Sequence, residues 1–388
     1  MGTLVWVELD ADAPGHNLRE LRACAGEGVK LCAVVKSNAY GHGVEQMVPL
    51  LDDADWFAVN SLDEGLELRR LGVSRPVLLV GYVPLDRVGE AVGAGLSMTV
   101  FNAETIRALA GACGEPGQEA KVHLKVETGT GRQGVLMEEL ADFVRLVHST
   151  PGVILEGLST HYANIEDTLN HSYAEQQLAV FDEALQLVCS LGPRPPVVHT
   201  ACSAASILFP ETHFDMLRAG ISVYGLWPSR ETYLSALSGS GPVPDLVPVL
   251  SLKTRVAQLK TLPRGSCVGY GCTFKTSRST RVAVLPVGYA DGYDRSLGNR
   301  AYVLVRGQRA PVLGRICMNV VMADVTDVEG VQLEEEVTLL GRSGDERITA
   351  ELMAEWAATI NYEVVTRTSP FLTRKVVRGG DDPRAGLA

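Results

Sequence analysis

The sequence has no apolar run long enough to cross a membrane. It contains 388 residues, of which 46% are hydrophobic, but its longest apolar runs are short ones such as Pro76–Val83 and Val282–Val287. A membrane-spanning helix needs about 20 such residues. The N-terminus also lacks the basic start and hydrophobic stretch of an export signal. We therefore expect a folded cytoplasmic protein without a membrane anchor.

Positive charge is scarce. The chain has 35 Lys and Arg residues against 46 Asp and Glu residues, which gives a formal net charge of −11, and no local basic cluster offsets it. A negative field repels the phosphate backbone of nucleic acids. The charge balance therefore argues against a nucleic-acid partner.

Patterns for disulfides and metal ions are missing as well. The eight cysteines include no CxxC pair, and the eight histidines include no HxxxH or HExxH spacing. These spacings are the usual signatures of redox pairs and zinc sites. We predict reduced thiols and no metal site.

From about residue 30 to residue 226, short β-branched runs alternate with amphipathic helical stretches. Eight predicted strands end near Val35, Asn60, Val80, Val100, Val126, Thr160, Thr200 and Leu217. Such alternation is typical of a parallel sheet covered by helices. No GxGxxG turn follows the first strand, as it often does in an open dinucleotide-binding sheet. We predict an α/β protein with a TIM-like (β/α)₈ barrel over residues 10–226.

The pattern changes in the C-terminal part. Trp227–Pro248 is rich in Ser, Pro and Gly without clear periodicity, so we predict a linker there. The following strands are expected at Val249–Gln258, Val282–Gly288, Ala301–Val305, Val320–Val325 and Glu336–Leu340. With a single late helix at Thr349–Ala358, residues 227–379 are predicted to form a mainly β domain. Thr3–Leu9 is a candidate to pair with it, and 380–388 reads as a disordered tail.

A lysine follows the first predicted strand of the barrel, where active sites of this fold lie. The strand ends in AVVKSNAYGHG, and Lys36 comes directly after the apolar or small residues Leu31–Val35. A lysine that leaves a buried strand is easily desolvated and its pKa falls, which suits a Schiff base.

Donors for an anion follow the seventh and eighth strands. HTACSAAS carries Ser203, and DMLRAGISVYG carries Arg218 and the N–H groups of Gly220 and Ile221. Phosphate sites of these barrels often lie after these two strands. A lysine nucleophile and a phosphate site at one barrel mouth imply pyridoxal 5′-phosphate as cofactor.

Lys125 presents an electrostatic problem in the same region. It lies in an apolar strand two residues before Glu127 and near the turn that presents Arg132. Two like charges at about 4 Å cost roughly 4 kcal/mol at an effective dielectric constant of about 20. Deprotonation of Lys125, its carbamylation by CO₂, or neutralisation by Glu127 would each remove the repulsion.

Several motifs resemble those of alanine racemases, the fold-type III pyridoxal-phosphate enzymes. AVVKSNAYGHG is similar to their cofactor-lysine motif, VETGTGRQG to (V/I)DTGMGR(I/L)G, VVHTACSAA to H-x-ANSAA, and LRAGISVYGL to R-x-G-I-x-x-YG. CVGYGCTF, VGYADGY and GRICMN resemble signatures of their β domain. The motifs occur in the family's order along almost the whole chain, which makes the resemblance far more specific than any single match.

The resemblance implies a racemase that interconverts L- and D-alanine with two acid/base groups. These would be Lys36, the Schiff-base lysine, and Tyr270, which would reach in from the partner subunit of a homodimer with shared active sites. Racemisation removes the α-proton on one face and returns it on the other, so two flanking bases are the minimum apparatus. The expected partners are thus a small amino-acid substrate and a second copy of the chain.

The resemblance also implies the other site residues. The cofactor contacts would be Tyr40, Ser203, Gly220 and Ile221 at the phosphate, Arg218 at the pyridine nitrogen, Arg132 at the phenolate oxygen, and His161 between Tyr270 and Arg218. The substrate would meet Arg132 and Met318, with Tyr289 at the entrance, and Lys125 would carry a carbamate. Because arginine only donates hydrogen bonds, Arg218 would leave the ring nitrogen unprotonated and weaken the electron sink.

Four positions depart from the family pattern without removing a catalytic group: Glu127, Cys202, Asn319 and Pro370. Pro370 leaves the preference for alanine open, so a serine or broad-specificity racemase is the main alternative. A non-catalytic pyridoxal-phosphate carrier would resemble the barrel alone, and a related decarboxylase typically carries Glu in place of Arg218. Whether D-alanine serves peptidoglycan synthesis or is degraded stays open.

Overall fold

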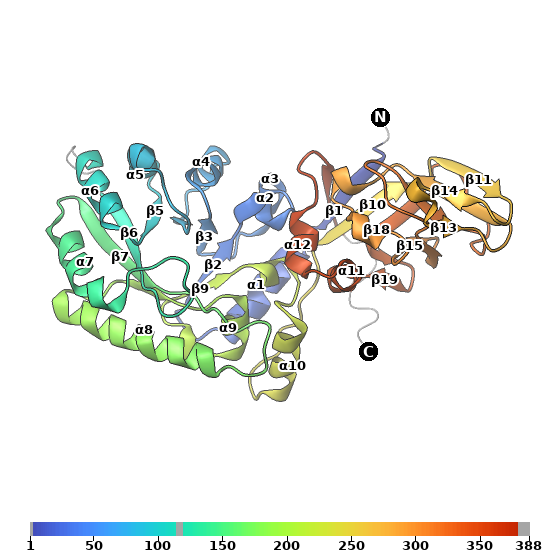
Figure 1. The fold of residues 1–388 in the computed structure, drawn as a ribbon. Helices are drawn as coiled ribbons and strands as arrows, with labels where there is room; N and C mark the ends of the chain where they lie inside the picture. Colours follow the sequence, from blue (N-terminus) through green and yellow to red (C-terminus); the bar gives the residue numbers. More distant parts are fainter. Residues whose placement is uncertain (1–2, 114–118, 379–388) are drawn as a thin grey trace. The chain divides into compact units, whose positions relative to one another are not determined.

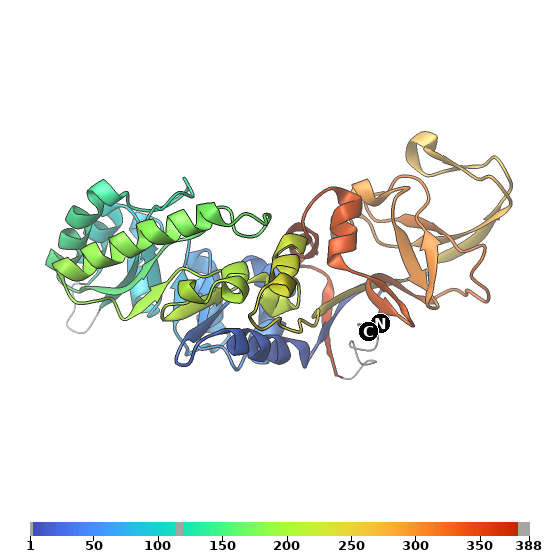
Figure 2. The same ribbon diagram turned by 90° about the horizontal axis from the view of Figure 1, so that it is seen from below.

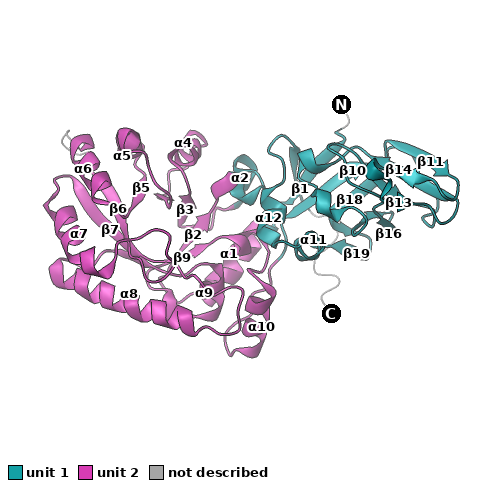
Figure 3. Cartoon of the chain, in the orientation of Figure 1, with its two compact units in different colours: residues 1–13, 38–50, 247–388 teal, residues 14–37, 51–246 magenta. Residues whose placement is uncertain are grey.

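The computed structural model describes residues 3–113 and 119–378, so the predicted tail at 380–388 lies outside the described residues. By contacts the chain divides into two units (Figure 3). Unit 1 comprises Met1–Ala13, Asn38–Leu50 and Val247–Ala388, and unit 2 comprises Pro14–Ser37 and Leu51–Leu246. The domain boundary between residues 226 and 227 stays a prediction.

Unit 2 contains the predicted barrel. Its eight-stranded sheet has the order β8-β7-β6-β5-β4-β3-β2-β9, and all neighbours are parallel. The strands are β2 (Lys30–Val34), β3 (Trp56–Val59), β4 (Val77–Leu79), β5 (Ser97–Val100), β6 (Ala120–Lys125), β7 (Val153–Ser159), β8 (Val197–His199) and β9 (Met216–Ala219). The Asp215 N–H donates to Val198 O at 2.9 Å and the Arg218 N–H to Ala201 O at 3.0 Å, which brings the two end strands together. The α/β barrel fold is confirmed.

Helices surround this sheet (Figure 1). They are α1 (Ala13–Cys24), α4 (Leu62–Arg70), α5 (Val88–Gly93), α6 (Ala103–Ala112), α7 (Met137–Ser149), α8 (Ser172–Leu191), α9 (Ser203–Leu208) and α10 (Arg230–Ser238). Helix α7 shows why they dock: Leu140, Phe143, Val144 and Val147 are buried at helical spacing and form one apolar stripe. Figure 2 shows α7 and the long α8 side by side on the outside of the barrel.

Helix α10 contradicts the predicted linker at Trp227–Pro248. The Ser229 side chain accepts a hydrogen bond from the Thr232 N–H and caps the helix. The helix buries only Thr232 and Ala236, so its apolar pattern is too weak to be seen in the sequence. The N-terminal cap was the available signal.

Unit 1 is mainly β, as predicted. Its larger sheet has the order β16-β15-β18-β10-β1-β20, with β19 paired to β18, and a second sheet has the order β11-β14-β17. The strands are β1 (Val5–Asp10), β10 (Leu250–Arg255), β11 (Gln258–Leu262), β12 (Cys267–Val268), β13 (Phe274–Lys275), β14 (Thr280–Leu285), β15 (Tyr302–Val305), β16 (Gln308–Pro311), β17 (Val321–Asp324), β18 (Glu336–Ser343), β19 (Glu346–Ile348) and β20 (Thr373–Val377). The helices are α2 (Lys36–Tyr40), which begins in unit 2, α3 (Val44–Met47), α11 (Ala350–Ala357) and α12 (Asn361–Thr366).

The N-terminal strand β1 pairs antiparallel with β10 and parallel with β20. Trp6 is only 1% exposed, and its ring lies against the side chains of Arg255 and Lys375. The first strand of the chain is therefore part of the unit 1 sheet.

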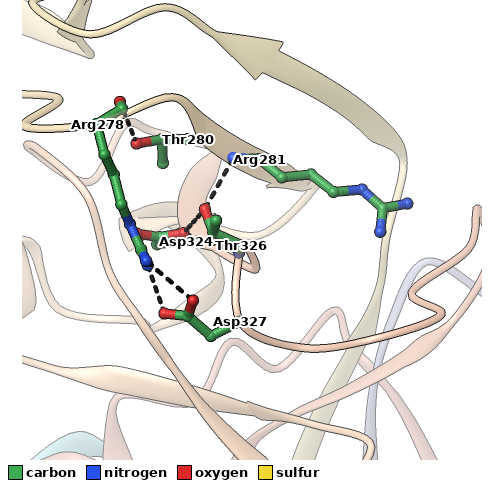
Figure 4. Close-up of polar contacts among 6 residues, drawn as sticks. All are labelled: Arg278, Thr280, Arg281, Asp324, Thr326 and Asp327. Atoms are coloured by element: carbon green, nitrogen blue, oxygen red, sulfur yellow. Dashed lines mark hydrogen bonds and ion pairs between the residues drawn. The ribbon is translucent and has the colours of Figure 1, made fainter.

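A polar network joins two loops of unit 1 (Figure 4). Arg278, between β13 and β14, donates to Asp327 and also lies 3.9 Å from Asp324. Thr326 accepts from the Arg281 N–H at 2.9 Å and donates its own N–H to Asp324 at 2.9 Å. These contacts hold the start of β14 to the loop that follows β17.

Candidate active site

Lys36 lies where β2 gives way to an unusual turn. The four residues after it, Ser37 to Tyr40, have φ values of 54°, 54°, 52° and 52°, in the left-handed region. Such a conformation costs roughly 1–2 kcal/mol per residue for an L-amino acid. The Asn38 side chain accepts from the Val44 N–H at 2.9 Å, and Asn38 O accepts from the Gly43 N–H at 2.9 Å. The turn is thus imposed by its surroundings, as strained functional backbone is.

The Lys36 amine is half-buried, and its pKa is lowered from the ordinary 10.5. Burial is the main cause and the charge of Arg132 the second, whereas Glu64 acts in the opposite direction. The neutral, nucleophilic amine is therefore more populated than on an exposed lysine.

The Arg218 guanidinium is held by backbone carbonyls after β7 and β8. It donates to Thr160 O, His199 O and Thr200 O, each at 2.9 Å. It makes no ion pair within the described ranges. Its charge is therefore solvated by dipoles alone and stays available to the site.

Two imidazoles complete the surroundings of Arg218. Its guanidinium lies 3.4 Å from His161 Nδ1 and also contacts His199 Nδ1. Because arginine can only donate, both ring nitrogens accept, and each imidazole carries its proton on Nε2. Burial, followed by the charge of Arg218, holds the pKa of both histidines well below 6.5. Both are neutral at neutral pH.

The hydrogen bonds continue into the barrel interior. His199 Nε2 lies 2.8 Å from His123 Nδ1, and His123 Nε2 lies 3.1 Å from Glu156 Oε2. With the tautomers set by Arg218, the donors all point one way, from Arg218 through His199 and His123 to Glu156. An added Cβ at Gly157 would lie 2.2 Å from the His123 ring, so glycine gives this imidazole its space.

Sequence reasoning missed His123 and Glu156. Both lie in buried strands, at VHLK in β6 and LEG in β7, and a polar residue within an apolar run was the signal. Since the two side chains meet only across neighbouring strands, their pairing could not be read along the chain.

Lys125 ends β6 and is 9% exposed. Burial, then the charges of Arg218 and Arg132, lower its pKa to about 8. It makes no ion pair with Glu127 among the described residues, although the sequence left that pairing open. About a tenth of Lys125 is therefore uncharged at pH 7, far more than for an exposed lysine.

The Glu127 carboxylate serves the following loop instead. It accepts from the Gly129 N–H at 2.7 Å and from the Arg132 N–H at 3.1 Å. Burial alone would raise the pKa of Glu127, but these and neighbouring backbone donors outweigh it and lower the pKa below 4.5. Glu127 thus orders the turn that presents Arg132.

The predicted phosphate donors lie together. Ser203 begins α9 and is 3% exposed, and its Oγ accepts from the Gly220 N–H at 2.9 Å. Ile221 begins a short 3₁₀ helix, so its N–H lies outside the helical hydrogen-bond pattern. The two loops after β8 and β9 are therefore brought side by side with their donors adjacent.

The other four predicted site residues belong to unit 1. The Tyr40 ring lies 6.2 Å from that of Tyr362. Tyr289 and Met318 are neighbours, since the Ala290 N–H donates to Met318 O at 3.0 Å. Tyr270, at the tip of the β12–β13 hairpin, is 72% exposed.

Comparison with known proteins identifies the family. The family description "Alanine racemase, N-terminal domain" matches residues 9–228, and "Alanine racemase, C-terminal domain" matches residues 249–376. The chain belongs to the alanine racemase family.

Full-length relatives agree with this membership. The alanine racemase of Leptospira interrogans is 40% identical over 376 residues, 96% of this chain and 95% of the relative, and that of Desulfovibrio desulfuricans is 41% identical over 379 residues, 96% and 98%. The structure of alanine racemase from Bacillus anthracis with bound L-Ala-P superposes with a TM-score of 0.90 at 35% identity and covers 98% of this chain and 97% of its own. The alanine racemase structure from Streptomyces lavendulae matches with a TM-score of 0.90 at 34% identity and 98% coverage of both chains. The predicted family, fold and enzyme class, an isomerase, are confirmed.

Among residues 3–113 and 119–378, no helix combines the length and the apolar character that a transmembrane segment needs.

The role of Glu127 can be tested by removing its charge. Because its folded-state pKa is lowered, the stabilisation is present above about pH 4.5 and is lost as the pH falls through the lowered value. We expect Glu127→Gln to lower the free energy of unfolding by about 1 kcal/mol at pH 7. Thermal unfolding of both proteins from pH 7 to pH 3.5 would show this difference shrinking in acid.

Glu183→Gln is the matched control, because Glu183 is an exposed carboxylate of α8 with no hydrogen bond or ion pair in the described part of the chain. A difference for Glu127→Gln that does not change with pH would contradict the proposed role of the charge.

Proposed function

We propose that this chain is a pyridoxal-phosphate-dependent racemase that interconverts L- and D-alanine, with Lys36 and the partner subunit's Tyr270 as its two bases. One observation carries the proposal. A half-buried lysine with a lowered pKa lies in the same unit as an arginine solvated by carbonyls and an adjacent pair of phosphate donors. Family membership supplies the reaction type.

The donors fit the cofactor. The Ser203 hydroxyl and the Gly220 N–H lie 2.9 Å apart and could both turn to a phosphate oxygen. The Lys36 amine could form a Schiff base with the aldehyde carbon. The Arg218 guanidinium could donate a hydrogen bond to the ring nitrogen. When bound, pyridoxal phosphate supplies the electron-withdrawing ring that acidifies the α-carbon.

The protein's own groups then control the protons. Lys36, with its lowered pKa, takes or returns the α-proton on one face, and the phenol of the partner subunit's Tyr270 serves the other face. Arg218 cannot give up a proton at neutral pH, so it orients the ring nitrogen without protonating it. The chain from His199 to Glu156 fixes the orientation of the imidazole that contacts Arg218.

Lys125 is proposed to be carbamylated. CO₂ reacts with a neutral amine, and a pKa of about 8 makes that form available. The charges of Arg218 and Arg132, which lower this pKa, would favour the resulting anion. Glu127 does not compete, since its oxygens accept from the loop backbone. The carbamate would hold Arg132 towards the substrate carboxylate through charge-assisted hydrogen bonds.

The shared site of a homodimer is supported by the surface of unit 1. Phe371, Tyr270 and Met318 are 95%, 72% and 56% exposed in the single chain. Large apolar and aromatic side chains of this kind are typical of interfaces. Their exposure fits a second copy that covers these side chains and receives Tyr270 and Met318.

Substrate preference and location belong to the proposal as well. Pro370 offers no hydroxyl, so a serine or broad-specificity racemase is the alternative that a substrate panel decides. The eight cysteines are free, which fits a cytoplasmic location.

The role of Lys36 as the cofactor lysine can be tested by covalent trapping of the bound cofactor. Borohydride reduction in the presence of pyridoxal phosphate is expected to label Lys36, because its amine is the most accessible neutral one in the site. Lys36→Ala should lose the label and at least 10³-fold of the racemisation rate. Chiral chromatography with L-alanine, L-serine and other L-amino acids measures the rate.

Lys260→Ala, which removes an exposed lysine of β11, should keep both label and rate. A label on another lysine would contradict the role of Lys36, and equal rates for alanine and serine would favour the broad-specificity alternative.

The shared site predicts complementation. Lys36→Ala and Tyr270→Phe each inactivate one base, but a mixed dimer contains one intact site. Mixing the two inactive proteins should restore up to about a quarter of the wild-type rate per chain for random exchange. No recovery under conditions of demonstrated subunit exchange would refute the contribution of Tyr270 across subunits.

The carbamate predicts a carbon-13 signal. Wild-type protein equilibrated with ¹³C-labelled bicarbonate should show a carbamate resonance that Lys125→Ala lacks and Lys260→Ala keeps. Lys125→Ala should also raise KM for alanine, and a small added carboxylate should partly reverse this. A wild-type protein with full activity and no such resonance would overturn the modification.

A further inference from the structure

Two cysteines flank Tyr270 at the tip of a hairpin. Cys267 begins β12 and Cys272 lies in the connecting loop before β13. Both are exposed, and they lie near enough for the Cys267 side chain to raise the pKa of Cys272. The five-residue spacing is not a CxxC motif, so only the hairpin brings the two sulfur atoms together.

The strands of the hairpin and its base are anchored to the rest of unit 1. Val268 and Phe274 pack into a cluster with Val282, Leu313 and Met322. The Gly265 N–H donates to Thr276 O at 2.7 Å at its base. The Arg278 network holds the chain that follows (Figure 4). The two thiols are therefore kept side by side by a fixed framework.

The tip itself is compliant. Gly269 and Gly271, on either side of Tyr270, have φ values of 72° and 75°, which favour glycine. Within residues 3–113 and 119–378, one side-chain hydrogen bond holds the tip, from Asn299 Nδ2 to Thr273 Oγ1 at 3.2 Å. A bond between Cys267 and Cys272 would close a ring that contains Tyr270 and both glycines.

The electrostatic setting suits thiol oxidation. Lys275 lies directly opposite Cys267 in the strand register, and both face outward. The neighbouring Cys267 side chain raises the pKa of Cys272, while Lys275 acts in the opposite direction. The strand register places the Lys275 ammonium beside the Cys267 thiol, so we expect Cys267 to react first with an oxidant and Cys272 to follow.

We propose that Cys267 and Cys272 are a reversible dithiol–disulfide pair which peroxide oxidises and which controls the position of Tyr270. The Cys267 thiolate attacks one peroxide oxygen, the O–O bond breaks, and the leaving hydroxide takes a proton to become water. The Cys272 sulfur then attacks the sulfenic sulfur, and protonation of its hydroxyl releases a second water. Hydrogen peroxide is reduced to two waters while two thiols become one disulfide.

The effect on activity rests on the proposed function, in which Tyr270 is the base of the partner's site. A disulfide has an S–S distance of about 2.05 Å, well below the distance between two thiols that are not covalently joined. Disulfide formation would draw Cys267 and Cys272 together and displace the tip that carries Tyr270, because the strands below the tip are held in place. A displacement of about 1 Å at a catalytic group can cost on the order of 100-fold in rate.

The experiment treats the intact full-length protein with hydrogen peroxide and then with a dithiol reductant. Peptide mapping by mass spectrometry should find a Cys267–Cys272 cross-link that lacks two hydrogens, and racemisation should fall at least 10-fold and recover on reduction. Cys267→Ser and Cys272→Ser should form no such cross-link and keep their rate after the same treatment.

Cys189→Ser is the control, since Cys189 is an exposed thiol on α8 in unit 2. This variant should respond to peroxide as wild type does. Absence of the Cys267–Cys272 cross-link would overturn the pair, and a complete cross-link with an unchanged rate would overturn its control of Tyr270. A protein without any racemase activity would contradict the proposed function instead, while the cross-link would still be judged by mass.

Discussion

The guanidinium of Arg218 is the group around which the barrel mouth is organised. Carbonyl oxygens after β7 and β8 receive its hydrogen bonds, and no carboxylate of the described residues neutralises it. Its charge contributes to the lowered pKa of His161, His199 and Lys125, after burial in each case. The mouth is therefore rich in uncompensated positive charge, which is the condition for binding an anionic phosphate and a substrate carboxylate.

The direction of hydrogen bonding follows from the same group. Arginine can only donate, so the contacting imidazole nitrogens must accept, and the bonds run inward to Glu156 at the far end. A carboxylate at that end polarises the histidines without touching the site. The barrel thus separates the negative charge of Glu156 from the proposed cofactor site, while the same charge helps to hold His199 in place through His123.

The backbone is strained beside one proposed base, Lys36, and flexible beside the other, Tyr270. Lys36 is followed by four residues with positive φ, a conformation held by backbone and side-chain hydrogen bonds. Tyr270 instead lies between two glycines on an exposed tip. One base is thereby positioned by its own unit, whereas the other has freedom that contacts with a partner subunit would remove.

The sequence by itself determined the barrel and the β-rich unit. Strand positions could be predicted because buried parallel strands are short apolar runs. The same runs predict that Lys36, Ser203 and Arg218 lie at strand ends, where they are found, while their roles in the reaction stay predictions. Helix α10 was missed because it buries too few residues to leave a periodic pattern.

Only the tertiary structure decided which side chains meet. The hydrogen bonds from His199 through His123 to Glu156 cross neighbouring strands. Glu127 accepts from the backbone of the following turn and forms no ion pair with Lys125 in the described part of the chain, because the turn folds back onto its carboxylate. The approach of Cys267 to Cys272 depends likewise on hairpin register. Contacts of this kind arise when segments that are distant along the chain pack together, or when a segment turns back on itself. No local sequence pattern encodes them.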